Sequence, residues 1–238
     1  MRRFLIGHSL CKSLMMTEIA IYDMDRTITR VATYTPFLLH AARRRAPWRL
    51  LLMPFALLAM LAYGARLIGR GRLKEINQAL LLGRRVAPAS LTGVVADFAG
   101  RTVAANVQPG ALRRIAADKA AGRRLVLATA SYRLYAAAIA ERLGFDDVIA
   151  TDSVIGRDGR IRAKIDGENC YGPAKLRMIE AWLAREGLDR AACRIAFYSD
   201  HVSDAPVLEW ADEPFAVNAH EPLLRLARAR GWPTLDWR

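Results

Sequence analysis

The chain has 238 residues, which corresponds to one large domain or to one domain that carries an insertion. Hydrophobic residues make up 53% of it and charged residues 25%, which excludes an intrinsically disordered chain. The 36 lysines and arginines outnumber the 23 acidic residues and give a net charge of +13. This charge points to an anionic partner, such as a phosphorylated small molecule, a membrane surface or a nucleic acid. The three cysteines lack the spacing of a zinc site or a disulfide framework, which argues against both.

The first 15 residues begin with a basic stretch that is typical of a secretory signal. However, Lys12 interrupts the apolar run, and no small-residue cleavage motif follows it. We therefore expect residues 1–15 to be a disordered tail and the folded chain to begin at about Met16.

The remaining elements are predicted from apolar periodicity and from glycine and proline positions. Residues 17–22 predict a short buried strand, and helical patterns then continue to about residue 121. After this point strands and helices alternate: strands at 124–129, 148–150, 195–198 and 215–217, helices at 132–143 and 173–185, and a hairpin at 153–162 that turns at Asp158 and Gly159. This order predicts an α/β fold with a doubly wound, mostly parallel sheet that binds ligands beyond the carboxyl ends of its strands.

Two pairs of carboxylates follow two of the predicted strands. Asp23 and Asp25 come directly after the strand at 17–22, and Asp200 and Asp204 come after the strand at 195–198. Four carboxylates at one edge of a sheet repel one another unless a divalent cation lies among them, and oxygen ligands suit Mg²⁺. The sequence therefore predicts a magnesium site there, whereas the alternative is a solvated acidic loop at each position.

Two further segments place phosphate-binding groups at the same edge. Thr129, Ala130 and Ser131 end a predicted strand and lead into a helix, which offers a hydroxyl group and free backbone N–H groups. Lys175 lies near the start of the helix at 173–185 and supplies a positive charge. Each also has a structural interpretation, Thr129 as a helix N-cap and Lys175 as a solvated helix lysine.

The order of these motifs resembles the haloacid dehalogenase (HAD) superfamily of phosphatases over residues 18 to about 218. The motifs are D-x-D-x-T at 23–27, the strand end at Thr129, Lys175, and D-x-x-x-D at 200–204. The segment G-x-x-x-x-G-x-x-K at 167–175 and the long helical insertion are similar to the phosphoserine phosphatase branch, subfamily IB. The resemblance implies a HAD-like Rossmannoid core at 16–29 and 106–238, with an all-helical type I cap at 30–105.

The resemblance also implies roles for individual residues. Asp23 is the expected nucleophile and Asp25 the expected general acid and base. Mg²⁺ is expected to bind Asp23, the main-chain carbonyl of Asp25 and Asp200, with Thr27 and Asp204 in support. The phosphate-binding residues are those named above.

The insertion carries a basic and an apolar feature. Residues 41–85 contain ten arginines and lysines and one glutamate, and residues 50–65 carry no charge. As a helix this apolar run is about 24 Å long, shorter than a ~30 Å hydrocarbon core, and a single crossing would separate Asp23 from Asp200. We expect a helix or hairpin, broken near Pro54, that lies on an anionic membrane surface. The alternatives are a buried helix of the cap and a homodimer face.

These features predict a cytoplasmic Mg²⁺-dependent phosphomonoester hydrolase that forms an aspartyl-phosphate intermediate. The basic, apolar cap is similar to the phosphatidylglycerophosphate phosphatases of this superfamily, so the expected substrate is a membrane-lipid phosphate at the inner face of the membrane. The alternative substrate is a soluble phosphoserine-like metabolite. A nucleic-acid-binding protein is disfavoured, because aromatic residues do not alternate with the basic run.

Overall fold

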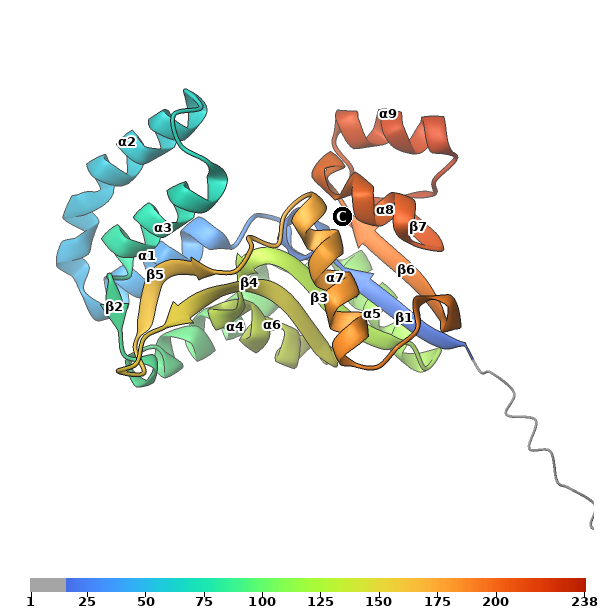
Figure 1. Cartoon of the computed structure of the whole chain (residues 1–238), viewed down its shortest axis with the longest axis horizontal. Coiled ribbons are helices and arrows are strands. Elements are labelled where there is room, and N and C mark those ends of the chain that lie inside the picture. Colours follow the sequence, from blue (N-terminus) through green and yellow to red (C-terminus); the bar gives the residue numbers. More distant parts are fainter. Residues whose placement is uncertain (1–15) are drawn as a thin grey trace, which may run out of the picture.

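The computed structural model describes residues 16–238, so the expected tail at residues 1–15 lies outside the described residues. The core is an eight-stranded sheet with the order β2-β5-β4-β3-β1-β6-β7-β8 (Figure 1). All neighbouring strands are parallel except β5, which runs antiparallel to both β4 and β2. The strands are β1 (Thr17–Tyr22), β2 (Arg85–Val86), β3 (Arg124–Tyr132), β4 (Asp147–Ile155), β5 (Ile161–Asp166), β6 (Cys193–Ser199), β7 (Glu213–Val217) and β8 (Thr234–Leu235).

Helices cover both faces of this sheet. Along β1, Ala20 and Tyr22 face one hydrophobic cluster and Ile19 and Ile21 face the other, as the alternation of side chains along a strand requires. The first cluster includes side chains of α1 (Tyr34–Arg45), α4 (Thr92–Ala105), α5 (Pro109–Ala120) and α6 (Arg133–Leu143). The second includes α7 (Pro173–Arg185), α8 (Ala205–Trp210) and α9 (Glu221–Arg230). The predicted α/β class and its doubly wound, mostly parallel sheet are confirmed.

The predicted elements agree with the structure where the pattern was long and continuous. The strand at 17–22 and the helix at 173–185 have the bounds of β1 and α7, and the predicted hairpin is the antiparallel pair β4 and β5. The short edge strands β2 and β8 were not predicted. Each has only two residues, too few to show a periodic pattern.

The insertion is not entirely helical, which corrects the expectation for the cap. It contains α1, η2 (Pro47–Leu52), α2 (Met53–Gly64), α3 (Arg70–Leu81), β2, η3 (Pro88–Ser90) and α4. In β2, Val86 is buried and pairs with Ile161 of β5, so the insertion adds an edge strand to the core sheet. The chain re-enters the core beside its exit, because Thr29 forms an antiparallel bridge with Val107.

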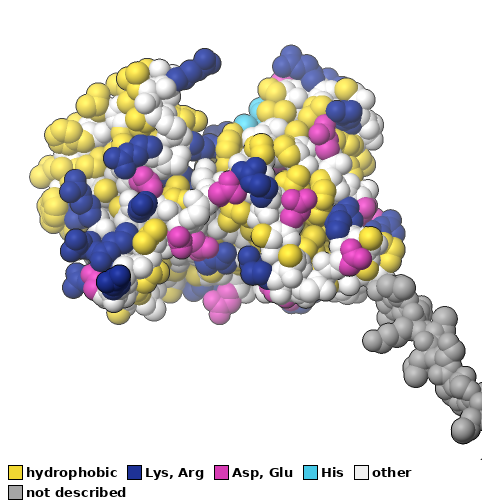
Figure 2. Space-filling model, in the orientation of Figure 1, with side chains coloured by type: hydrophobic (Ala, Val, Ile, Leu, Met, Phe, Trp, Pro, Cys, Tyr) yellow, Lys and Arg dark blue, Asp and Glu magenta, His cyan; other side chains and the backbone are white. Residues whose placement is uncertain are grey.

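The apolar run of the insertion lies at the surface. It forms η2 and α2, and the span Pro47–Gly64 has a mean hydropathy of 1.4 with only 11% of its residues buried. Within residues 16–238 this is the one helix that is long and apolar enough to cross a membrane. In α2 only Ala56 and Ala59 are buried, so the alternative of a buried cap helix is wrong. Figure 2 shows the resulting hydrophobic surface over this part of the cap.

Candidate active site

The predicted catalytic residues line one cavity of about 400 Å³ at the carboxyl ends of β1, β3 and β6. Asp23 and Asp25 follow β1, Thr129 and Ala130 lie near the end of β3, and Asp200 follows β6. The surface is hollowed between the side that carries α2 and the side that carries α9 (Figure 2). Three strands that are adjacent in the sheet thus bring together residues that are up to 177 positions apart in the chain.

A tight helical turn, η1 (Met24–Ile28), places Thr27 between the first acidic motif and the last. Within it Arg26 has a φ of 67°, a left-handed conformation that reverses the chain and returns Thr27 beneath Asp23. The Thr27 hydroxyl lies 3.2 Å from Asp23 Oδ2 and 3.2 Å from Asp200 Oδ1, and it accepts the backbone N–H of Asp200 at 3.0 Å. Thr27 therefore fixes the two carboxylates side by side.

Lys175 neutralises the carboxylates at the base of the cavity. It is 2% exposed, and its Nζ donates to Asp23 Oδ1 at 2.8 Å and to Asp204 Oδ2 at 2.6 Å. The helix α7 positions it, because this helix begins directly after Gly172, whose φ of 60° suits glycine. Desolvation lowers the pKa of Lys175, but Asp204 and Asp23 together hold it above its ordinary value, so the lysine remains charged. The interpretation of Lys175 as a solvated surface residue is wrong.

The Asp25 side chain is held by hydroxyl groups from the insertion and from β3. Its Oδ1 accepts the backbone N–H and the hydroxyl of Thr33, each at 2.7 Å, and its Oδ2 accepts the Ser131 hydroxyl at 2.7 Å. The buried Tyr135 hydroxyl donates to Ser131 at 2.6 Å and orients it. Sequence reasoning did not identify Thr33 or Tyr135, because neither belongs to a motif: Thr33 lies in the insertion, and Tyr135 lies on α6 after the strand end at Ser131.

The expected magnesium ligands fit a hard divalent cation. Burial raises the pKa of Asp23 above its usual range, although Lys175 opposes this shift, and burial also raises the pKa of Asp200. A cation beside both carboxylates would relieve this cost. In residues 16–238 no three His, Cys, Asp or Glu side chains converge on one point, but the expected set needs only two carboxylates and the Asp25 carbonyl. Asp204 Oδ1 is buried without a hydrogen-bond partner in the described chain, which leaves an oxygen acceptor beside the pair.

The expected phosphate-binding strand end is partly engaged by protein groups. The buried Thr129 hydroxyl accepts the backbone N–H of Ser131 at 3.1 Å, so this N–H is already paired. The Ala130 carbonyl accepts Thr151 Oγ1 at 2.8 Å and Lys74 Nζ at 2.6 Å. Lys74 belongs to α3 of the insertion, and from the sequence it counted only as one of many basic residues.

An α/β sheet with this arrangement of carboxylates and a buried lysine defines a hydrolase site of the haloacid dehalogenase class. The family model described as haloacid dehalogenase-like hydrolase matches residues 20–209 of the chain. The chain therefore belongs to the haloacid dehalogenase-like hydrolase family, and it is a phosphatase-type hydrolase of that family.

Proteins of similar sequence include members with different names. The chain is 32% identical over 223 residues to the "Inhibition of morphological differentiation protein" of Streptomyces azureus. This alignment covers 92% of this chain and 78% of that protein. The chain is 31% identical over 173 residues to "Phosphoserine phosphatase SerB1" of Mycobacterium tuberculosis, which covers 72% of this chain and 53% of that protein. The relatives of the chain thus include a phosphoserine phosphatase, in agreement with the branch that the motifs predicted.

Solved structures agree with this assignment. A protein of unknown function from Bordetella pertussis Tohama I superposes with a TM-score of 0.85 at 28% identity, covering 94% of this chain and all of that chain. A phospho-aspartyl intermediate analogue of phosphoserine phosphatase superposes with a TM-score of 0.59 at 16% identity and 94% coverage of both chains. At 16% identity, the second match shows a similarity of fold only.

Proposed function

We propose that the protein is a Mg²⁺-dependent phosphomonoester hydrolase that acts on a lipid phosphate at an anionic membrane surface, with Asp23 as nucleophile and Asp25 as general acid and base. The observation that supports the chemistry best is the buried set of Asp23, Thr27, Lys175 and Asp200. It holds one carboxylate at the base of an open cavity, next to oxygen donors suited to Mg²⁺. When bound by Asp23, Asp200 and the Asp25 carbonyl, Mg²⁺ would neutralise the negative charge of the phosphoryl oxygens.

In the first half-reaction, an Asp23 carboxylate oxygen forms a bond to phosphorus as the bond from phosphorus to the ester oxygen breaks. A phosphomonoester dianion repels a carboxylate, so the charge of Lys175 beside Asp23 favours the approach. Asp25 in its protonated form gives its proton to the departing alkoxide. The hydrogen bonds from Thr33 and Ser131 fix the Asp25 carboxyl group for this transfer.

In the second half-reaction, water attacks the phosphorus of the aspartyl phosphate and the bond between phosphorus and Asp23 breaks. Asp25, now ionised, accepts a proton from that water. The products are inorganic phosphate and free Asp23, and Asp25 is again protonated for the next cycle.

The exposed apolar side chains of the cap support a membrane-bound substrate. We define the apolar cap surface as the exposed residues Trp48, Leu51, Phe55, Leu57, Leu58, Met60, Leu61, Tyr63 and Leu67. Leu51, Leu61 and Leu67 are 78%, 70% and 77% exposed, whereas side chains of this kind are ordinarily buried. Tyr63 also lines the active-site cavity, so this surface continues to its opening.

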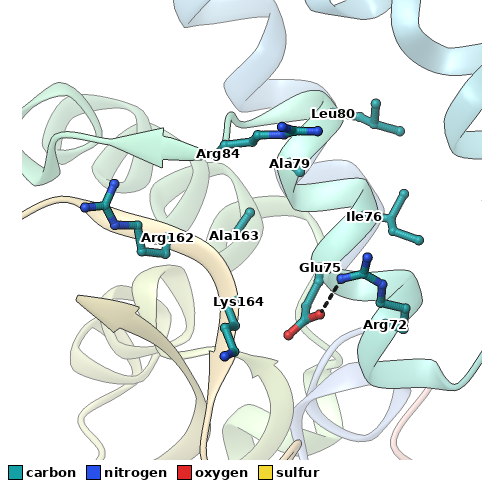
Figure 3. Close-up of a pocket in the computed structure, with 9 residues that line it drawn as sticks. All are labelled: Arg72, Glu75, Ile76, Ala79, Leu80, Arg84, Arg162, Ala163 and Lys164. Atoms are coloured by element: carbon teal, nitrogen blue, oxygen red, sulfur yellow. Dashed lines mark hydrogen bonds and ion pairs between the residues drawn. The ribbon is translucent and has the colours of Figure 1, made fainter. Parts of the chain in front are cut away.

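A basic groove lies between α3 of the insertion and β5 of the core sheet (Figure 3). Arg72, Arg84, Arg162 and Lys164 line it, with Glu75 as its one acidic residue, which pairs with Arg72 at 3.2 Å. Its volume is about 400 Å³. Basic residues next to an apolar helix favour anionic lipid headgroups, each contributing about 1 kcal/mol near the surface. We therefore favour a surface such as one containing phosphatidylglycerophosphate, at the inner face of the cytoplasmic membrane.

A soluble, phosphoserine-like metabolite is the second candidate substrate. The names of two relatives, phosphoserine phosphatase SerB1 and the histidinol-phosphatase of Neisseria meningitidis, favour it. The apolar cap surface would then be a homodimer face.

The test measures phosphate release from phosphatidylglycerophosphate in anionic and in neutral vesicles, and from soluble phosphoserine. We expect the anionic vesicles to give the highest turnover and the strongest cosedimentation, and Asp23→Asn to remove turnover on every substrate. Leu61→Asp with Leu67→Asp should weaken vesicle binding and spare turnover of a small chromogenic phosphate. The contribution of basic residues to vesicle binding is tested with Arg43→Gln and Arg66→Gln, because both side chains are exposed. Arg45 and Arg49 are unsuitable for this test, because they donate to the carbonyls of Leu82 and Leu80.

Equal turnover in both kinds of vesicle, together with a dimer in solution that Leu61→Asp dissociates, would favour the soluble substrate. Asp23-independent turnover would contradict the assigned chemistry.

A further inference from the structure

Lys74 is a buried cation in the active-site cavity that the reaction above does not use. It is 7% exposed, and its Nζ donates to the Ala130 carbonyl at 2.6 Å and to Asn169 Oδ1 at 2.7 Å. It also lies 4.4 Å from the centre of the Tyr132 ring. All of these partners are neutral, so its charge is solvated only by dipoles and by an aromatic face.

Within residues 16–238 no carboxylate forms an ion pair with Lys74 or with Arg70, which lies one helical turn earlier on α3. Arg70 also lines the cavity, and its guanidinium stacks 3.9 Å above the Tyr171 ring. Burial, followed by repulsion from Arg70, lowers the pKa of Lys74 to about 7. Buried charges in proteins are ordinarily paired, so Lys74 lacks a partner, whereas Arg70 is exposed and lies at the opening of the cavity beside it.

The remaining lining of the cavity does not supply that partner. Its acidic residues all come from the core, namely Asp23, Asp25, Asp200 and Asp204, and Lys175 already pairs with Asp23 and Asp204. The lining residues contributed by the insertion are neutral or basic: Ala32, Tyr34, Thr35, Pro36, Tyr63, Arg70, Leu73 and Lys74. The side of the cavity that the insertion lines is therefore positively charged.

We infer that the leaving group of the natural substrate carries a second negative charge near its phosphomonoester, and that Lys74 with Arg70 binds this charge. The inference rests on the proposed function, since it concerns the substrate of the same site. The second charge is a carboxylate or a phosphodiester, and both provide oxygen acceptors for an ammonium and a guanidinium group. A leaving group whose only charge is an ammonium group would face the like charges of Lys74 and Arg70 and is disfavoured.

The test compares four soluble phosphomonoesters at saturating Mg²⁺. 3-Phosphoglycerate carries a carboxylate, glycerophosphoglycerol phosphate carries a phosphodiester, glycerol 3-phosphate is neutral beyond its phosphate, and phosphoethanolamine carries an ammonium group. We expect kcat/KM for at least one anionic leaving group to exceed that for glycerol 3-phosphate by on the order of tenfold or more. Phosphoethanolamine should be the poorest substrate. The preferred anionic compound distinguishes carboxylate from phosphodiester recognition.

The key variant is Lys74→Gln, which removes the charge but keeps an N–H donor for the Ala130 carbonyl. It should lower kcat/KM for the preferred anionic substrate by on the order of 10- to 100-fold, mainly through KM, and change turnover of glycerol 3-phosphate little. Lys119→Gln is the matched control, because it makes the same change at an exposed position on α5 outside the cavity and should alter neither substrate.

Two results would overturn the inference. One is equal kcat/KM of the wild-type enzyme for anionic, neutral and cationic leaving groups. The other is an equal loss on all substrates in Lys74→Gln, which would make Lys74 only a structural contact between the insertion and the core. Absence of Asp23-dependent turnover on all four compounds and on the lipid would instead refute the proposed function.

Discussion

Replacing Lys175 by methionine tests the electrostatic organisation of the site. Methionine keeps most of the volume of the side chain but removes the cation that Asp23 and Asp204 share at 2.8 and 2.6 Å. Lys175 and Asp204 are each 2% exposed, so water cannot replace the lost charge. The variant leaves two buried carboxylates without a cation.

Removing one partner of a buried ion pair costs about 3–5 kcal/mol of the free energy of unfolding. For a chain of this length, this corresponds to a fall in Tm of roughly 6–20 °C. The loss should depend on pH. Burial already raises the pKa of Asp23 and Lys175 opposes this shift, so without the lysine the folded-state pKa of Asp23 lies still further above its unfolded value. The penalty is therefore complete above the folded-state pKa of Asp23 and is relieved as this group is protonated at lower pH.

The assay is thermal unfolding of wild type and Lys175→Met at pH 8 and pH 5 in metal-free buffer. We expect the difference in Tm to be largest at pH 8 and to shrink at pH 5. Lys175→Met with Asp204→Asn should recover part of the loss, and Mg²⁺ should stabilise the variant more than the wild type. A fall in Tm below about 2 °C at pH 8, or one that is the same at both pH values, would refute the reasoning.

Three other predictions concern the metal, the packing and a buried charge. Chelator should abolish phosphate release and added Mg²⁺ restore it, and Asp200→Ala should raise the Mg²⁺ concentration needed; full turnover in metal-free buffer would contradict this. Gly110→Ala should lower stability by about 1–3 kcal/mol in denaturant titration, because the new Cβ would lie 2.5 Å from the Trp237 Cα; unchanged stability would contradict this contact. Lys74→Met should raise Tm more at pH 6.5 than at pH 10. Burial lowers the pKa of the lysine from 10.5 to about 7, so the cost of burying its charge disappears as the pH rises. A difference in Tm that is the same at both pH values would argue against a buried charge.

The sequence by itself determined the sheet apart from its two edge strands β2 and β8, the strand ends that carry the site, and the family of the chain. β1 and α7 have strong local signals, an apolar run of strand length and an amphipathic period that begins at Pro173. Because parallel strands end at one edge, the positions of Asp23, Thr129 and Asp200 at or near the carboxyl ends of such strands were sufficient to predict one site. Family membership follows from the order of these motifs.

The tertiary structure alone decided which other side chains complete the site. Thr33, Tyr135 and Lys74 reach it from segments whose local sequence carries no chemical motif. The contacts of Thr33 and Lys74 depend on how the insertion folds back on β3, whereas Tyr135 reaches Ser131 from the first turn of α6. A local pattern does not encode such long-range packing.

The structure also decided that the apolar run at 50–65 lies at the surface. The sequence of an uncharged run of this length is compatible with burial in a cap, with packing against a second copy and with exposure to a membrane, so it does not distinguish among them. Only the packing of α2 on α3 shows that Ala56 and Ala59 face the protein while Leu51, Leu61 and Leu67 remain exposed. Burial is a property of the neighbours of a side chain, and most of these neighbours are distant in the sequence.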